Sequence, residues 1–282
     1  MLIKDASKLY VGAASVSAVY AGANKVWSSG FDPLSRTCRF MLTEEAHHMF
    51  VGETGVARVV QRTCQAMRDA GIEDPWDVAK IRSLGVIDLP TIQRKANLHF
   101  SLTLDLFGSE VSTNAANWFN SGLKGRYRED KLEDDHTLEG TTYPVLRPVD
   151  GAVRATEVPA LSALNMRLRD DYVKDCQKGV DRWNRAIEAL GIRFEIRLPH
   201  VAFNRKIGEF KSALYDLEGS PLTQEQWTAR QTEMLPSGDD QDFVEHLMGE
   251  PVLVPGEFAS WIAPPRVGID NKPGDFEYVK LA

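Results

Sequence analysis

One short stretch, residues 42–50 (LTEEAHHMF), constrains the fold most, because it sets acids and imidazoles among apolar residues at helical spacing. On an α-helix, residues three positions apart share a face, so the side chains of Glu45 and His48 point the same way. The surrounding apolar pattern predicts a buried face, and burying an unpartnered carboxylate and imidazole is costly. A bound metal ion would remove that cost. The alternative is a solvated cluster of charges on the helix surface.

Composition narrows the class of protein. The chain has 282 residues, a net charge of −7 and 43% hydrophobic residues, which argues against a general nucleic-acid binder with a basic face. Three widely spaced cysteines indicate buried thiols in a reducing compartment, and neither a disulfide framework nor a zinc site. No apolar run approaches the ~18 residues that a membrane helix needs. We expect a cytoplasmic protein.

The first thirty residues differ in composition from the rest. Short β-branched and aromatic runs separated by glycine predict two or three small strands there. A signal peptide is the alternative, although charged and hydroxyl residues interrupt its apolar stretch. Residues 8–27 also resemble a short N-terminal hairpin of phage tail and other virion proteins. We expect a domain boundary near residue 30, with a β-hairpin-like leader at 1–30 and a helical body at 31–282.

The body is expected to be mainly α-helical, with a β-hairpin and an irregular C-terminal region. The hairpin is predicted over 141–158, turning at Asp150 and Gly151, and a strand-like segment over 193–198. Thr223 and Gln226 predict a capping box. Helices are predicted over about 33–71, 76–82, 88–119, 159–190, 223–233 and 239–248.

Two further clusters carry possible metal ligands. Asp105 lies between apolar residues of the predicted 88–119 helix, and Glu133 and His136 again stand three apart. Taken singly, the first is read as a half-buried aspartate bonded to a neighbouring hydroxyl, and the second as a solvated acidic loop. Together with Glu45 and His48 they repeat, in chain order, most of the Glu, Glu-x-x-His pattern by which ferritin-like bundles hold two metal ions. An incomplete ferritin-like bundle with a metal centre is therefore the leading hypothesis.

Longer motifs in the body resemble a known enzyme family, the oxygenase component of benzoyl-CoA 2,3-epoxidase. The resemblance covers about residues 31–282. The motifs are residues 39–63 (RFMLTEEAHHMFVGETGVARVVQRT), 84–93 (LGVIDLPTIQ), 105–108 (DLFG), 122–126 (GLKGR), 134–136 (DDH), 168–175 (LRDDYVKD), 182–184 (RWN), 202–205 (AFNR), 261–265 (WIAPP) and 276–278 (FEY).

The resemblance implies a non-haem di-iron enzyme that epoxidises the ring of benzoyl-CoA with O2. Electrons would come from a separate NADPH-dependent reductase that carries flavin and iron–sulfur groups. By position, Glu45 would bridge or ligate the irons, and His48, Asp105 and His136 would each ligate iron. Asp135 or its neighbour Asp134 would ligate iron or support His136, an assignment that competes with Glu133 at the helical spacing.

Members of that family are longer and place the helix with the first iron carboxylate ahead of the Glu-x-x-His helix. We therefore expect this chain to resemble the C-terminal part of the oxygenase, with weak or single-iron binding and little epoxidation. The alternative function is a virion or tail-associated structural protein that carries the helical body without catalysis.

Two loop segments support weaker predictions. His200 is expected to be a loop residue bonded to backbone. Asn204, Arg205 and Lys206 could meet the phosphates of a coenzyme A ester, and ordinary surface cations explain them equally well.

Overall fold

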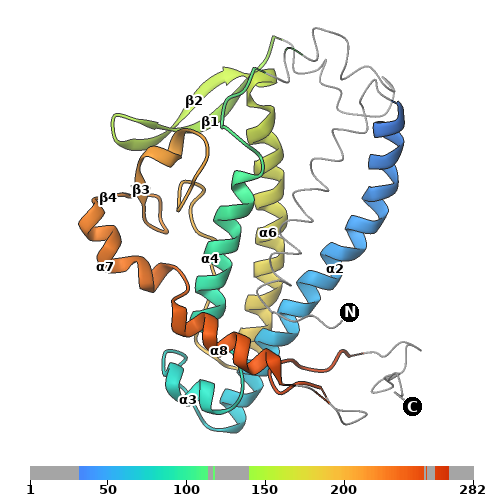
Figure 1. Cartoon of the computed structure of the whole chain (residues 1–282), viewed down its shortest axis with the longest axis vertical. Coiled ribbons are helices and arrows are strands. Elements are labelled where there is room, and N and C mark those ends of the chain that lie inside the picture. The colour runs from blue at the N-terminus through green and yellow to red at the C-terminus, as the bar shows by residue number, and fades with distance from the viewer. Residues whose placement is uncertain (1–31, 114–116, 118–139, 251, 253–257, 267–282) are drawn as a thin grey trace.

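The computed structural model describes residues 32–113, 117, 140–250, 252 and 258–266 (Figure 1). Within the first helix, most side chains between residues 32 and 47 are also outside the description. The predicted leader at 1–30 lies outside the described residues, as do Glu133, Asp134, Asp135 and His136. In the described part, no helix is long and apolar enough to cross a membrane.

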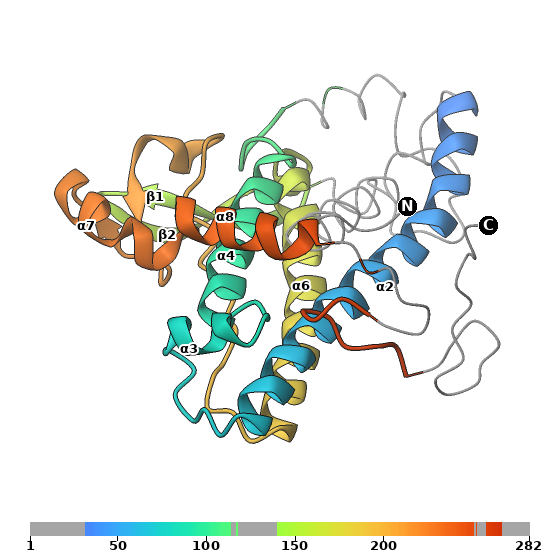
Figure 2. The ribbon, with the colours of Figure 1, turned by 60° about the horizontal axis from the view of Figure 1, so that its bottom comes forward.

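Three long helices dominate the described chain: α2 (Asp32–Asp69), α4 (Leu89–Asp105) and α6 (Leu164–Ala189). In both views α4 and α6 run side by side, and the C-terminal half of α2 packs against α6 while its N-terminal half stands away from both (Figures 1 and 2). Two phenylalanines in the N-terminal half of α2, Phe40 and Phe50, are exposed. The expectation of a mainly α-helical chain is confirmed.

The main hydrophobic core lies where the three helices meet. Val60 and Met67 of α2, Phe100 of α4 and Tyr172 of α6 are completely or almost completely buried in one cluster. The rings of Phe100 and Tyr172 stack with centroids 6.0 Å apart. Burial of this apolar surface is what holds the helices together, because each helix alone would expose its apolar face to water.

Helix α4 begins as the sequence predicts and ends earlier. Asp88 caps it by accepting from the backbone N–H of Thr91 at 2.8 Å, and Pro90 occupies the first turn. The helix stops at Asp105, so its predicted extension to 119 is wrong. Gly108 takes a φ of +81°, a left-handed conformation that terminates helices. The chain then reaches the segment just before α6, where the N–H of Ser112 donates to the carbonyl of Ser162.

The predicted hairpin is confirmed in detail. Strands β1 (Thr142–Val149) and β2 (Ala152–Pro159) pair antiparallel, with Val149 opposite Ala152. Asp150 and Gly151 both have positive φ, as a two-residue type I′ turn requires. The hairpin packs through Val145 on the short 3-10 helix η2 (Ala160–Ala163) and the start of α6, outside the main core (Figure 1).

The predicted strand at 193–198 is wrong, because the segment forms neither helix nor strand. Side-chain amides take the place of a neighbouring strand. Asn184 of α6 bonds both the N–H and the carbonyl of Ile196, each at 2.8 Å. Gln93 of α4 does the same for Arg197, at 2.8 and 2.7 Å. The segment is thus fixed between two helices without a β-ladder.

The remaining elements wrap one side of the helices: α3 (Val78–Ser83), η3 (Glu209–Ser212), β3 (Leu214–Tyr215) with β4 (Pro221–Leu222), α7 (Gln224–Met234) and α8 (Gly238–Gly249). The capping box predicted for Thr223 and Gln226 is present at the start of α7. Helix α8 is held to α3 and α4 by one buried carboxylate, because Asp240 accepts from Arg82 at 2.5 Å and from Arg94 at 2.8 Å.

Candidate functional site

The described chain places the sequence-predicted ligands Glu45 and His48 on one helix and Asp105 on another. Glu45 and His48 lie in the N-terminal half of α2, where the side chain of His48 is exposed and that of Glu45 is outside the description. Asp105 is the last residue of α4. His136 and Asp135 lie outside the described residues. The predicted ligand set therefore stays a prediction.

Asp105 has charged neighbours that the sequence did not indicate. One carboxylate oxygen accepts from Nε of Arg205 at 2.6 Å, and the other accepts from the backbone N–H of Lys206 at 2.9 Å. The side chain of Asp105 is 10% exposed and that of Arg205 is fully buried. Asn204 docks beside them, donating to the hydroxyl of Ser101 on the same helix. The loop around residue 205 is therefore bound along the last turn of α4.

A second buried acid extends this arrangement. Glu110 accepts from Arg169 of α6 at 2.9 Å, and the same oxygen lies 3.2 Å from Nη1 of Arg205. Both ion pairs are completely buried. Asp105, Glu110, Arg169 and Arg205 together form what we call the four-charge cluster. Its two acids balance its two arginines, as burial of charge requires.

Neighbouring backbone groups also bond to the four-charge cluster, although the buried Nε of Arg169 has no hydrogen-bond partner. Arg169 also donates to the carbonyl of Gly108 at 2.6 Å, and the N–H of Glu209 donates to Glu110 at 2.7 Å. Burial, and secondarily the charge of Arg205, lower the pKa of Arg169 to about 10, against the opposing effect of Glu110. Arg169 is therefore still charged at neutral pH.

Gly208 allows the backbone to pass close to this cluster. Its φ is +81°, and a Cβ at this position would overlap the carboxylate of Glu110. Only glycine tolerates both conditions. The glycine thereby brings the N–H of Glu209 within bonding distance of Glu110.

Sequence reasoning missed Glu110 and Arg169. Arg169 stands three positions from the buried Met166 and from the buried Tyr172, so its place on the buried face of α6 was available as a signal. The proposed contact of Arg205 with coenzyme A phosphates is wrong for this conformation, because Arg205 is buried against two acids. His200 behaves as expected, since its Nδ1 accepts from the N–H of Ala202, and burial lowers its pKa.

The described donors do not by themselves fit an iron centre. Among the described residues, no group of three or more histidine, cysteine, aspartate or glutamate side chains could hold a metal ion. Asp105, the best placed of the predicted ligands, has a cation or an N–H on each oxygen. Each carboxylate oxygen keeps a second lone pair, and ligating carboxylates are commonly hydrogen-bonded as well.

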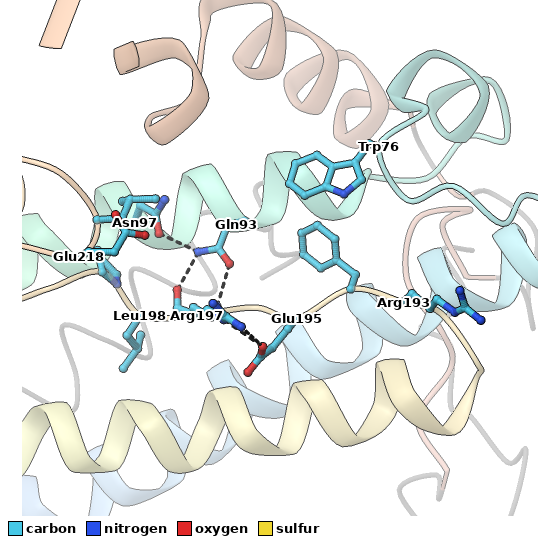
Figure 3. Close-up of a pocket in the computed structure, with 11 residues that line it drawn as sticks. Trp76, Gln93, Asn97, Arg193, Glu195, Arg197, Leu198 and Glu218 are labelled. Atoms are coloured by element: carbon cyan, nitrogen blue, oxygen red, sulfur yellow. Dashed lines mark hydrogen bonds and ion pairs between the residues drawn. The ribbon is translucent and has the colours of Figure 1, made fainter. Parts of the chain in front are cut away.

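A separate pocket of about 480 Å³ opens near the start of α4 (Figure 3). Trp76 and Phe194 form one end, with ring centroids 5.3 Å apart, and Trp76 is 65% exposed. The amides of Gln93 and Asn97 face it, and both are engaged, with Arg197 and with the carbonyl of Met234. Gln93 is twelve residues before Asp105, roughly 18 Å along the helix. The pocket is thus distinct from the four-charge cluster.

Comparison with known proteins gives one strong similarity, although no family model matches the chain. The chain is 51% identical over 253 residues to benzoyl-CoA oxygenase component B of Aromatoleum evansii. The match includes 90% of this chain and 53% of that protein, so the chain spans about half the length of the curated relative it matches. Identity at this level over so many residues indicates common descent. In sequence, the chain is therefore a relative of benzoyl-CoA oxygenase component B, as its motifs indicated.

Proposed function

We propose that the chain is part of an oxygenase component that epoxidises the aromatic ring of benzoyl-CoA with O2. The observation that carries this proposal is the 51% identity over 253 residues to a benzoyl-CoA oxygenase component B. The mainly helical body with its hairpin agrees with the ferritin-like class expected from the motifs. The virion alternative rested on residues 8–27, which lie outside the described chain, and no finding supports it.

Iron is the metal that we propose for this function. Its ligands would be Glu45, His48, Asp105 and His136, with Asp135 as a ligand or support, and a di-iron centre would supply the activation of O2. This assignment comes from the sequence motifs, and the described donors do not assemble it. No step of the reaction is derived through the metal for that reason. The structure adds that the carboxylate of Asp105, one of these proposed ligands, accepts a hydrogen bond from Arg205.

The proposal includes a second protein. A relative named component B implies at least one further component, and we propose that this is the NADPH-dependent flavin and iron–sulfur reductase expected from the motifs. We also keep the cytoplasmic location as part of the proposal. These points concern the whole oxygenase, of which the chain corresponds to about half.

The proposed function is tested with the purified full chain, loaded anaerobically with Fe²⁺ and mixed with benzoyl-CoA, a reductant and isotopically heavy O2. Mass spectrometry of the CoA ester is expected to show a small yield of product heavier by one labelled oxygen atom, in keeping with the weak iron binding and little epoxidation expected from the motifs. The variant His48→Gln should lose this product, and His246→Gln, on the exposed face of α8, should keep it. Absence of both labelled product and benzoyl-CoA binding, measured by calorimetry, would refute the proposal.

A further inference from the structure

The pocket near the start of α4, which we call the Trp76 pocket, has two aromatic rings at one end (Figure 3). The rings of Trp76 and Phe194 have centroids 5.3 Å apart and are tilted by 52° to each other. Two tilted rings form a corner, in which a third flat ring can stack on one face while its edge meets the other. An aliphatic group would gain only the burial of its surface there. The corner therefore favours an aromatic ligand.

Trp76 is held in an exposed position by its own backbone. Its N–H donates to the carboxylate of Asp74 at 2.9 Å, and its carbonyl accepts from the N–H of Val78 at 2.8 Å. Trp76 is nevertheless 65% exposed. Apolar surface left in water forgoes roughly 25 cal/mol for each Å² that burial would remove from solvent. A ligand that covers the exposed ring face would recover part of that free energy.

The wall of the Trp76 pocket that carries Phe194 is fixed before any ligand arrives. Asn184 bonds both backbone groups of Ile196, and Gln93 bonds both backbone groups of Arg197. These bonds attach the 193–198 segment to α6 and α4. Binding to a preformed site spends little free energy on ordering the protein, so even a small ligand can bind measurably.

The charges that line the Trp76 pocket cancel. Arg197 pairs with Glu195 at 2.5 Å, and the other two charged lining residues, Arg193 and Glu218, have opposite signs. An ion that entered would lose hydration without meeting an excess of opposite charge. The volume of about 480 Å³ lies in the range of roughly 300–1,000 Å³ typical of small-molecule sites. Charge and size together favour a small uncharged ligand.

We propose that the Trp76 pocket binds an uncharged planar aromatic molecule of one or two fused rings, stacked on Trp76. This site goes beyond the proposed function, because Gln93 of the pocket lies roughly 18 Å along α4 from Asp105. Binding is measured on the iron-free chain without benzoyl-CoA. Failure of the proposed oxygenase function would therefore leave this result intact, and the reverse holds as well.

The test titrates the full-length iron-free chain with 5-fluoroindole, an uncharged two-ring probe, followed by fluorine NMR. The expected Kd is about 1 mM, as befits so small a ligand. Trp76→Ala should weaken binding about tenfold, whereas Trp76→Phe should retain most of it because an aromatic face remains. A Kd above about 10 mM for the wild type, or an unchanged Kd in Trp76→Ala, would overturn the proposal.

A matched control removes another exposed aromatic ring. Phe50 of α2 is 63% exposed, close to the exposure of Trp76, and does not line the Trp76 pocket. Phe50→Ala should leave the Kd of 5-fluoroindole unchanged. An equal loss in Phe50→Ala and Trp76→Ala would show that the probe adheres to exposed rings in general, and would overturn the assignment to this pocket.

Two charged probes with the same ring system test the class of ligand. The cation 5-fluorotryptamine and the anion 5-fluoroindole-3-acetate are expected to bind no tighter than 5-fluoroindole, because the lining charges cancel. Binding of either ion about tenfold tighter than the neutral probe would assign the pocket to a charged ligand, and would overturn the proposal.

A protein-side measurement locates the bound probe in the wild type. The indole N–H resonance of Trp76, assigned by its loss in Trp76→Ala, is followed by nitrogen-15 NMR during the same titration. This resonance should shift and reach half-saturation at the Kd given by the fluorine signal. Saturation of the probe signal while the Trp76 resonance stays in place would put the probe elsewhere, and would overturn the proposal.

Discussion

Gln93 bonds Arg197 on both sides of its peptide backbone, accepting from its N–H at 2.8 Å and donating to its carbonyl at 2.7 Å. The two residues are 104 positions apart in the chain. The side chain of Gln93 thus supplies to Arg197 both backbone hydrogen bonds that a neighbouring strand would supply in a sheet.

Replacement of Gln93 by alanine is expected to destabilise the fold. The change removes both hydrogen bonds to the backbone of Arg197, which is an exposed residue, and each such bond contributes about 0.5–1.5 kcal/mol. Urea unfolding followed by circular dichroism measures the difference. Gln177→Ala is the control, because Gln177 bonds only the neighbouring Asp181 on the exposed face of α6. Equal effects of the two substitutions would contradict the role assigned to Gln93.

Replacement of Asp240 by asparagine should loosen the attachment of α8. Asp240 is buried and accepts from Arg82 and Arg94, so the loss of its charge should lower the free energy of unfolding by about 3 kcal/mol. The adjacent Asp239→Asn, at an exposed position, should change stability by less than about 0.5 kcal/mol. Chemical denaturation of both variants decides the matter, and a wild-type-like Asp240→Asn would disprove the assigned role.

The same carboxylate predicts a pH dependence. Burial alone would raise the pKa of Asp240, but hydrogen bonds from Arg94, from the N–H of Ser237 and from Arg82 outweigh it and hold the pKa below its ordinary value of 3.8. A depressed pKa in the folded state adds stability above the ordinary value, and this stability is lost as pH falls through the folded pKa. The stability gap between wild type and Asp240→Asn should therefore be full at neutral pH and shrink below pH about 4. A gap independent of pH would contradict the shift.

Replacement of Gly208 by alanine should disturb the four-charge cluster. A Cβ at this position meets the Glu110 carboxylate in addition to the strain of a positive φ. The control is Gly191→Ala, where φ is +76° but no atom lies within 4 Å. The control should lose about 1 kcal/mol, from strain alone, and Gly208→Ala should lose clearly more. Thermal unfolding of the two variants compares strain with overlap directly, and equal losses would rule out the overlap.

Two thiols, that of the buried Cys64 and that of the half-buried Cys176, should resist alkylation in the native protein. Burial raises the pKa of Cys64 and of Cys176 to about 12, and only the thiolate reacts. Iodoacetamide at pH about 8 is expected to leave both unmodified by peptide mass mapping, and to modify both after denaturation. Rapid modification of Cys64 in the native state would contradict its complete burial.

The sequence correctly predicted those features that are decided by residues close together in the chain. Caps and turns were found because the deciding residues are adjacent, as with Thr223 and Gln226 of α7 or Asp150 and Gly151 of the hairpin. The end of α4 was missed because it depends on the left-handed conformation of Gly108. The 193–198 segment has the composition of a strand, and only tertiary packing reveals that amides replace its neighbour.

The candidate site was predictable only in part, for a similar reason. The sequence identified Asp105 as a notable acid among apolar residues, but its partner Arg205 lies 100 positions further along the chain. The sequence motifs indicated the similarity to benzoyl-CoA oxygenase component B, and the 51% identity supports it. They carry no information on which buried acid is held by which arginine, because that pairing arises only when α4, α6 and the loop around residue 205 pack together.

The 193–198 segment and α8 are attached to the core by different kinds of hydrogen bond, which implies an order in which they detach on unfolding. Neutral amides fasten the 193–198 segment, so neither acid nor high salt acts on that connection directly. A carboxylate between two guanidinium groups fastens α8, and protonation removes its charge. On acidification, α8 should therefore detach while the extended segment stays in place. Hydrogen exchange would then reveal a partly opened form in which one end of the core is uncovered.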